Sequence, residues 1–219
     1  MTDYSYEARN PAGGSINSAL HWDAKILRDA LREAILTSPE SFLTTVEDVD
    51  TKPLDHWIDE MRSSTWAVAE REGNVVGVAA AKRPDPHKDK EDQATTRYIE
   101  SVWISPDLRG RRLSERLIRY LLEEEHRKNQ DIRHFLLWVF TTNSSAIRLY
   151  EDMGFVRTPD ANKGIRTEIK YHLDFGREVY AAVHLAVNDT ARRHDERQYG
   201  VTYRTLGEKD SGSAIPQPR

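Results

Sequence analysis

The segment spanning residues 96–122 constrains the fold most, because it predicts a strand, a glycine-containing turn and a helix in direct succession. Residues 96–104 are rich in the β-branched and aromatic residues that strands favour. Beyond Gly110, apolar residues recur at the spacing of one helix face: Leu113, Leu117, Ile118, Leu121 and Leu122. This pattern places the N-terminus of a helix directly after a tight turn.

The turn that precedes this helix has the features of an anion-binding site. The first N–H groups of a helix have no partner within the helix, and the helix dipole favours a negative charge beside them. Gly110 lets the backbone approach a ligand closely. Four arginines add positive charge: Arg109, Arg111, Arg112 and Arg116. An exposed basic helix start is the alternative interpretation, but the flanking segments favour a phosphate site.

A second segment, residues 143–155, predicts a helix with two polar side chains on one stripe. Asn143 and Tyr150 are seven residues apart, which on a helix is nearly two turns or about 10.5 Å. Gly154 is typical of a helix end. From the helix pattern alone, Asn143 is equally explained as an N-cap, and Tyr150 as a core tyrosine with a hydrogen-bonded hydroxyl.

Together these segments resemble the acetyl-CoA-binding motif of the GNAT superfamily of N-acetyltransferases. The family pattern is [Arg/Gln]-x-x-Gly-x-[Gly/Ala]; here Arg109 matches, Arg112 stands at the glycine position and Ser114 at the last small position. Residues 143–155 match the family's Asn-x-x-Ala-x-x-Leu-Tyr-x-x-x-Gly-Phe segment at every marked position. The resemblance covers roughly residues 15–175 and is strongest over 96–157.

The resemblance implies a mixed, mostly antiparallel central sheet flanked by helices, whose fourth and fifth strands splay apart to admit the pantetheine arm. The sequence pattern predicts the order β-α-α-β-β-β-α-β-α-β. The first strand is expected at 15–20, and the first helix from an N-cap at Asp23 to Ser38-Pro39. The remaining elements are expected at 54–63 (helix), 65–71 and 75–81 (a hairpin with a Gly-Asn turn), 82–95 (loop), 134–140 (strand) and 164–175 (last strand).

The chain is expected to divide into a loose leader at 1–14, a GNAT domain at 15–175, an appendage at 176–206 and a disordered tail at 207–219. Within the appendage, the spacing of apolar residues predicts a helix at 179–193 and a strand at 199–206. Its functional interpretation is a lid or an arm for homodimer formation, and the alternative is a C-terminal extension packed on the domain.

The resemblance assigns Tyr150 the role of general acid that protonates the departing sulfur of CoA. A strand amide around Val102 to Ile104 would stabilise the oxyanion. Arg112 in place of the family glycine is expected to require an ordinary helical backbone angle. The full set of expected cofactor-binding residues is Val102, Trp103, Ile104, Arg109, Gly110, Arg111, Arg112, Leu113, Ser114, Glu115, Asn143 and Tyr150.

Glu100 is the candidate general base, because it lies on the strand before the cofactor turn. Alternate strand residues share a face, so Glu100 is expected beside Val102 and Ile104, where an apolar surrounding would raise its pKa. It could instead bind the cation of the substrate or pair with Arg97. Trp138 stands where some ribosomal-protein N-terminal acetyltransferases carry a glutamate base, which argues against their mechanism.

Composition excludes several other functions. A net charge of −4 argues against binding to nucleic acid, which proteins bind through clustered positive charge. The sequence has no 18-residue apolar run and no N-terminal signal, so a cytoplasmic protein without membrane contact is expected. The absence of cysteine excludes a Cys acyl-enzyme and favours direct attack in a ternary complex. The eight histidines show no metal-ligand spacing, so no metal is expected.

The leading hypothesis is an acetyl-CoA-dependent N-acetyltransferase that acts on a primary amine of a small molecule or peptide. One alternative is a GNAT-like module that binds CoA or acts as a sensor without catalysis. Another is transfer of a longer acyl chain, which the width of the gap near Trp103, Trp138 and Phe140 would decide. The acceptor itself stays open among a peptide N-terminus, a lysine, a polyamine and an aminoglycoside.

Overall fold

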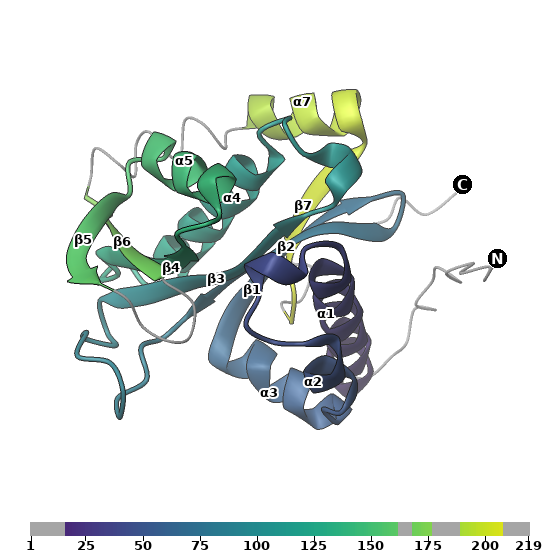
Figure 1. Ribbon diagram of the computed structural model, residues 1–219. Helices are drawn as coiled ribbons and strands as arrows, with labels where there is room; N and C mark the ends of the chain where they lie inside the picture. Colours follow the sequence, from purple (N-terminus) through teal and green to yellow (C-terminus); the bar gives the residue numbers. More distant parts are fainter. Residues whose placement is uncertain (1–15, 162–167, 177–188, 208–219) are drawn as a thin grey trace, which may run out of the picture.

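The computed structural model describes residues 16–161, 168–176 and 189–207, whose strands form one seven-stranded sheet in the order β5-β6-β4-β3-β2-β1-β7 (Figure 1). The helices are α1 (Ile16–Thr37), α2 (Val46–Asp50), α3 (Leu54–Ser63), α4 (Leu113–Lys128), α5 (Ser144–Asp152) and α7 (Asp189–Tyr199). The strands are β1 (Ser64–Arg71), β2 (Asn74–Lys82), β3 (Thr96–Ile104), β4 (His134–Phe140), β5 (Val156–Ala161), β6 (Glu168–Asp174) and β7 (Val201–Thr205). Among these, β3 and β4 run parallel and the other neighbours antiparallel.

The sheet is buried on both faces, as β2 shows. Val78 and Ala80 enter a core shared with α1 and α3, whereas Ala79 and Ala81 enter a core shared with α4. A strand covered on both sides is apolar throughout, which explains the run of small and branched residues there. Figure 1 shows α1, α2 and α3 on one side of the sheet and α4 and α5 on the other. The predicted mixed, mostly antiparallel sheet with helices on both faces is confirmed.

The predicted first strand at 15–20 is wrong, because residues 16–20 already belong to α1. Leu20, Ala24 and Leu27 keep the helical spacing, so the apolar stripe continues through the proposed boundary. Asp23 is therefore inside the helix rather than at its N-cap. Its carboxylate accepts hydrogen bonds from Arg204 and from the amide of Gly207, a partnership with the C-terminal segment that local sequence does not reveal.

The predicted hairpin is confirmed, but its turn lies one residue earlier than expected. Arg71 pairs with Asn74, so the two turn residues are Glu72 and Gly73, with φ of 53° and 79°. Two positive φ angles suit the twist of a two-residue hairpin, and glycine adopts the second without strain. The helix predicted at 54–63 and the strand predicted at 134–140 are confirmed as α3 and β4.

The C-terminal segment adds a helix and an edge strand. The predicted strand at 199–206 is confirmed as β7, which pairs with β1. The helix predicted at 179–193 falls mostly outside the described residues, where α7 begins at Asp189. The last strand predicted at 164–175 corresponds to β6; residues 164–167 of that prediction lie outside the described residues. The strand β5 was not predicted. Of the helices in the described ranges, none is both long and apolar enough to cross a membrane.

Candidate active site

β3 and β4 separate after a short contact, which opens a gap in the middle of the sheet. They pair at three positions, from Thr96 opposite His134 to Tyr98 opposite Leu136. Beyond these positions the two strands diverge. These are the fourth and fifth strands of the predicted order, since the strand predicted at 15–20 is absent. The splayed pair of strands that the sequence resemblance implies is therefore confirmed, and the gap lies beside the strand that leads into the glycine turn.

Two cavities meet at this gap. The first, here called the turn cavity, has a volume of about 560 Å³ and its lining includes Arg109, Gly110, Arg112, Ser114, Glu115 and Ser145. The second, the strand-gap cavity, has a volume of about 350 Å³ and its lining includes Tyr98, Glu100, Ser101, Trp138, Phe140 and Glu168. Six residues line both cavities: Ser41, Phe42, Val102, Asn143, Ala146 and Tyr150. The cavities are therefore continuous around α5 and the loop after α1.

The structure brings nearly all the predicted cofactor residues together, since every one except Arg111 and Leu113 lines the turn cavity. Leu113 is 1% exposed in the apolar core beneath α4. The guanidinium of Arg111 lies 5.2 Å from the ring centroid of Tyr199 on α7. These two residues can therefore offer the turn cavity their backbone groups rather than their side chains.

The arginines of the turn differ in what they contact. Arg109 donates to the carbonyl of Ile104 at 3.0 Å and to the hydroxyl of Ser38 at 2.6 Å, so it ties the turn to α1. Arg116 lies 2.5 Å from the fully buried carboxylate of Asp195 and does not line the cavity. Arg116 is therefore directed away from the turn cavity, whereas Arg109 lines it and keeps its charge beside the turn.

Two further exposed arginines bring positive charge to the turn cavity. Arg112 lines the cavity from the start of α4, and Arg148 lines it from α5. Arg148 was not among the predicted site residues. Arg148 lies two positions before Tyr150, so the helix does not place the two side chains on one face, and the motif spacing gave no signal for it.

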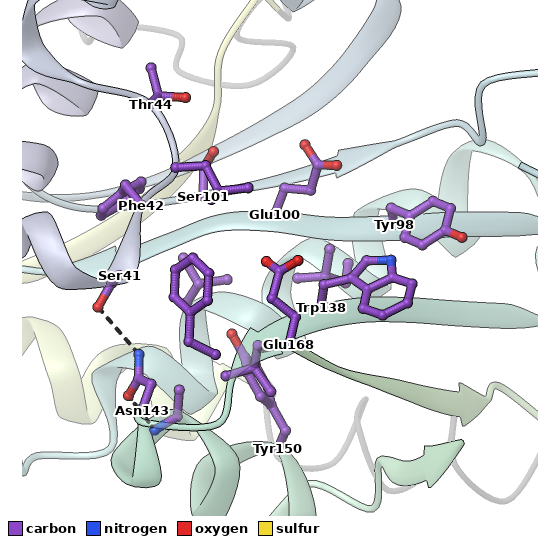
Figure 2. Close-up of a pocket in the computed structure, with 16 residues that line it drawn as sticks. Ser41, Phe42, Thr44, Tyr98, Glu100, Ser101, Trp138, Asn143, Tyr150 and Glu168 are labelled. Atoms are coloured by element: carbon purple, nitrogen blue, oxygen red, sulfur yellow. Dashed lines mark hydrogen bonds between the residues drawn. The ribbon is translucent and has the colours of Figure 1, made fainter. Parts of the chain in front are cut away.

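Asn143 caps α5 and also reaches across the junction of the cavities. Its side-chain oxygen accepts a hydrogen bond from the amide of Ala146 at 3.1 Å, and its nitrogen donates to the hydroxyl of Ser41 at 3.2 Å (Figure 2). The N-cap interpretation is confirmed. Because the side chain also lines both cavities, the cap holds a polar amide at the point where they join.

Tyr150 points from α5 into the gap, and its ring packs edge-on against Phe155 with centroids 5.8 Å apart. Burial raises the pKa of its hydroxyl well above the usual range. No described residue forms a hydrogen bond with this hydroxyl. It is therefore a protonated donor, held by packing at the junction of the two cavities.

β3 carries a bulge at the gap. Its pairing with β2 slips between Glu100 and Trp103, so that Ser101 and Val102 together stand opposite Ala79. Ser101 has a φ of 55°, which is uncommon for a residue with a side chain. A bulge leaves one residue out of the ladder of backbone hydrogen bonds. The strand irregularity that the resemblance implies is present.

The bulge reverses the alternation of side chains, so the predicted common face of Glu100, Val102 and Ile104 is wrong. Val102 and Ile104 pack against the core beneath α4, whereas Glu100 lies on the opposite face. There its carboxylate is 3.6 Å from the ammonium of Lys82. The inserted residue shifts every side chain beyond it to the other face.

The alternative pairing of Glu100 with Arg97 is also wrong. Arg97 lies on the α4 face, where its guanidinium donates to the carboxylate of Glu125 at 2.6 Å. Glu100 remains in the strand-gap cavity with half of its side chain exposed. It is therefore placed to meet a ligand in that cavity.

A second carboxylate in the strand-gap cavity was missed from the sequence. Glu168 begins β6 and is paired with Phe140 at the end of β4. Glu168, Glu100 and Tyr150 line the same cavity from three different elements, and Figure 2 shows Glu168 and Tyr150 on one side of β3 with the Glu100 carboxylate directed to the other. Desolvation raises the pKa of Glu168. The missing signal was the register of β6 against β4, which brings residue 168 to the gap.

Aromatic side chains form the rest of the strand-gap cavity. Trp138 and Tyr98 line it, and the ammonium of Lys170 lies 5.6 Å from each of their rings. Lys170 also forms an ion pair with Glu91 from the loop before β3. These contacts close the cavity at the end away from Tyr150.

A model of the acetyltransferase (GNAT) family matches residues 28–155, more than half of the chain. The chain belongs to the GNAT family. Among its sequence relatives, the mycothiol acetyltransferase of Thermobispora bispora is 28% identical over 124 residues, which are 57% of this chain and 40% of that protein. The chain thus spans about two fifths of the length of this relative.

Solved GNAT structures share the fold. The yncA protein of Salmonella typhimurium, solved with its cofactor acetyl-CoA, aligns at a TM-score of 0.56 and 20% identity over 72% of this chain and 91% of its own. The aminoglycoside acetyltransferase AAC(6')-Ib, solved with coenzyme A and kanamycin, aligns at a TM-score of 0.56 and 20% identity over 74% and 94%. At such identity the likeness concerns the fold alone.

The departure of this GNAT chain from the family pattern at Arg112 has a structural cost. Arg112 is the N-cap of α4 with φ 61° and ψ 15°, a left-handed conformation, so the expected ordinary helical angle is wrong. The chain turns into α4 through two positive φ angles, at Gly110 and Arg112. A residue with a Cβ pays roughly 1–2 kcal/mol for this conformation. Glycine adopts the left-handed conformation without this cost, which explains why the family pattern has glycine at this position.

Proposed function

We propose that this protein transfers the acetyl group of acetyl-CoA directly to a primary amine while both are bound. The observation that carries the proposal is the continuity of the two cavities at Tyr150. The turn cavity leads to the uncapped amides of α4, and the strand-gap cavity holds two carboxylates. An acyl donor and an amine acceptor can therefore meet beside one buried phenol.

The cofactor would bind with its pyrophosphate at the first turn of α4. In the described residues, no side chain caps the N-terminus of this helix. The amides of residues 110–115 therefore remain available to oxygen ligands, and the helix dipole favours an anion there. Arg112 and Arg148 line the same cavity and add charge. The pantetheine arm would follow the gap past Asn143 towards Val102.

The chemical step requires a base, an oxyanion donor and an acid. A carboxylate accepts one proton from the ammonium, the amine nitrogen forms its bond to the carbonyl carbon, and the carbon–sulfur bond breaks as Tyr150 protonates the sulfur. The second proton that the nitrogen loses on becoming an amide returns through solvent to the Tyr150 phenolate and restores the acid. The amides around Val102 to Ile104 would stabilise the oxyanion, and the bulge supports this role because it frees backbone groups from the ladder.

Two carboxylates are candidates for the base, the predicted Glu100 and the newly found Glu168. The raised pKa of Glu168 suits proton abstraction near neutral pH, since a base works best when its pKa approaches the operating pH. Glu100 lies near Lys82 and is more exposed, which suits orienting the cation of the substrate. We therefore propose Glu168 as base and Glu100 as substrate ligand, with the reversed assignment tested below.

The acceptor is proposed to be a small cationic amine. Two carboxylates, Glu100 and Glu168, line the strand-gap cavity and attract a cation. Among the sequence relatives, the mycothiol acetyltransferase supports a small molecule over a peptide.

The test is a thiol-release assay with acetyl-CoA and a panel of polyamines, aminoglycosides, amino sugars and peptides. The chain has no cysteine, so the protein itself gives no thiol background. Amine-dependent release of CoA is expected. Saturable acetyl-CoA binding by calorimetry without release by any amine would favour the CoA-binding module instead. Faster release from a longer acyl-CoA would favour the longer acyl donor.

Replacing Gly110 by aspartate should weaken acetyl-CoA binding roughly 10-fold or more, which corresponds to about 1.4 kcal/mol. The positive φ of 75° is strained for a residue with a side chain, and the carboxylate would repel phosphates. A Cβ built at Gly110 meets nothing within 4 Å, so crowding in the free protein is not the cause. Calorimetry measures the effect, with Gly110→Asn as the uncharged control of equal size. Equal affinity of wild type and Gly110→Asp would contradict the phosphate site.

Replacing Glu168 by glutamine should lower kcat/KM by roughly 10²–10⁴-fold and remove the acidic limb of its pH profile. Because burial raises the pKa of Glu168, the wild type loses its base as pH falls through that raised value, whereas glutamine does not titrate. Glu100→Gln is the matched variant and should mainly raise KM for the amine. If Glu100→Gln removes the limb and Glu168→Gln retains it, the two roles are reversed.

A further inference from the structure

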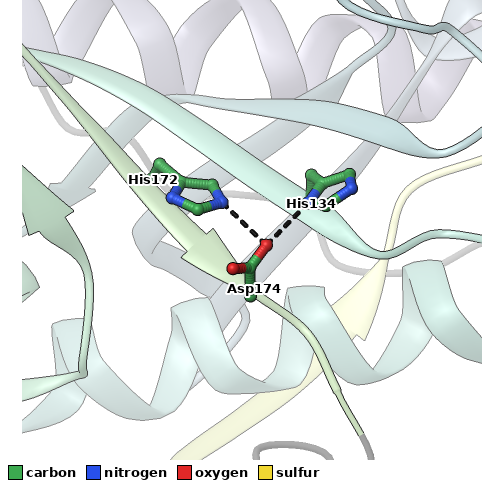
Figure 3. Close-up of side chains that lie close together, drawn as sticks. All are labelled: His134, His172 and Asp174. Atoms are coloured by element: carbon green, nitrogen blue, oxygen red, sulfur yellow. Dashed lines mark hydrogen bonds and ion pairs between the residues drawn. The ribbon is translucent and has the colours of Figure 1, made fainter. Parts of the chain in front are cut away.

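Three potential metal ligands with partly exposed side chains converge where β4 begins and β6 ends, outside the two cavities. His134 begins β4, and His172 and Asp174 lie near the end of β6 (Figure 3). One oxygen of Asp174 lies 2.8 Å from Nδ1 of His134 and 2.8 Å from Nε2 of His172. The three ligand atoms all lie within 4.8 Å of one another.

The sheet geometry explains this convergence. His134 is directly opposite Asp174 across the antiparallel pair, and His172 precedes Asp174 by two residues on the same strand. Residues two apart on a strand point to the same face, and directly opposed residues have Cβ atoms about 4.5–5.5 Å apart. The three donors therefore form a triangle on one face. Histidine 134 is 38 positions from histidine 172 in the sequence, so no local spacing reveals the group.

We propose that His134, His172 and Asp174 form a binding site for a divalent transition metal ion, with Zn²⁺ as the best-suited ion. Two imidazole nitrogens and one carboxylate oxygen match the ligand preference of Zn²⁺, and solvent completes the coordination. Ca²⁺ and Mg²⁺ are disfavoured because they require oxygen ligands. The sequence pattern predicts no metal, and this site depends entirely on tertiary pairing.

Small movements suffice to admit the ion. Ligands about 2.0–2.1 Å from a tetrahedral Zn²⁺ lie about 3.3 Å apart, against the present 2.8 Å from the Asp174 oxygen to each ring. The side chains are partly exposed, so an ion can enter from solvent.

The site is structural rather than catalytic. Trp138 is the residue of β4 in the strand-gap cavity that is nearest in sequence to His134; it is four positions away, roughly 13 Å at the rise of a strand. A bound ion would join β4 to β6, the two strands that form one wall of the gap. The inference is therefore independent of the proposed acyl transfer.

The experiment uses the full chain without an affinity tag, made metal-free by chelation. Titration with ZnCl₂ in a calorimeter should show one saturable site of micromolar affinity, and Co²⁺ should give the visible absorption bands of a tetrahedral site. Zn²⁺ should raise Tm, and excess chelator should reverse the rise.

Variants distinguish the site from adventitious binding. His172→Gln and Asp174→Asn should each weaken Zn²⁺ binding at least 10-fold, since one of three protein ligands is lost. His87→Gln and Asp131→Asn, which alter exposed residues elsewhere, should bind as the wild type does. Tm in chelator shows that each variant is folded. Absence of saturable binding, or equal affinity in His172→Gln, would overturn the proposal.

Discussion

Replacing Tyr150 by phenylalanine should lower kcat roughly 10–1000-fold while the affinity for acetyl-CoA barely changes. The substitution removes only the hydroxyl, because the ring that packs on Phe155 is retained. That hydroxyl points to the junction of the two cavities and has no hydrogen bond from the described residues, so its loss leaves no protein group unpaired. The expected fall in kcat therefore comes from slower protonation of the departing sulfur. Steady-state kinetics and calorimetry with acetyl-CoA measure the two quantities.

Tyr171→Phe is the matched control. Tyr171 lies on β6, its hydroxyl donates to Glu151 at 2.8 Å, and it lines neither cavity. Its substitution should leave kcat near the wild-type value. Burial raises the pKa of Tyr150, so the wild type should not lose this acid on the alkaline side below about pH 10. An unchanged rate in Tyr150→Phe would remove Tyr150 from the mechanism without affecting the fold.

Replacing Glu125 by glutamine should reduce the free energy of unfolding by roughly 3–5 kcal/mol. Glu125 on α4 and Arg97 on β3 form an ion pair at 2.6 Å, and their side chains are 5% and 7% exposed. Arg97 also donates to the carbonyls of Gln93 and Thr96. Glutamine keeps the shape of the side chain but leaves a buried guanidinium without its counter-charge. Urea denaturation followed by circular dichroism measures the loss.

Two further variants test whether the loss of stability comes from leaving a buried charge unpaired. The double variant Arg97→Met/Glu125→Leu should recover most of the stability, because a buried ion pair can often be replaced by apolar residues of similar volume. Asp59→Asn removes the partner of Arg62 in an exposed pair and should change stability by less than about 1 kcal/mol. A loss below about 1 kcal/mol in Glu125→Gln would show that solvent reaches Arg97.

Short-range pattern predicted the parts of the site that lie on single elements. The helical spacing after Gly110 correctly located α4, and residues 143–155 correctly located α5 with Asn143 at its start and Tyr150 facing the gap. Hydrogen bonding within a helix and the alternation of a strand depend on neighbours in sequence, so composition over ten or so residues is informative. The same reasoning failed at residues 16–20, where the helical stripe of α1 begins earlier than expected.

The positions of acidic groups in the gap depended on contacts between distant segments. One inserted residue at Ser101 moved Glu100 away from the face of Val102, and the pairing of β6 with β4 brought Glu168 into the cavity. A strand sequence states which residues alternate, but the register with its neighbour decides where the alternation begins. Arg116, predicted as a phosphate ligand, was likewise directed elsewhere by Asp195 from the C-terminal helix.

The sequence by itself determined the family, the order of most elements and the presence of a glycine-containing turn before α4, with Tyr150 on the later helix α5. Those features depend on the spacing of residues within short segments, which the sequence alone specifies. Only the tertiary structure decided which carboxylates line the strand-gap cavity, and only it grouped His134, His172 and Asp174. The physical reason is that strand register and bulges are set by the packing of two cores against one sheet, and no local segment contains that information.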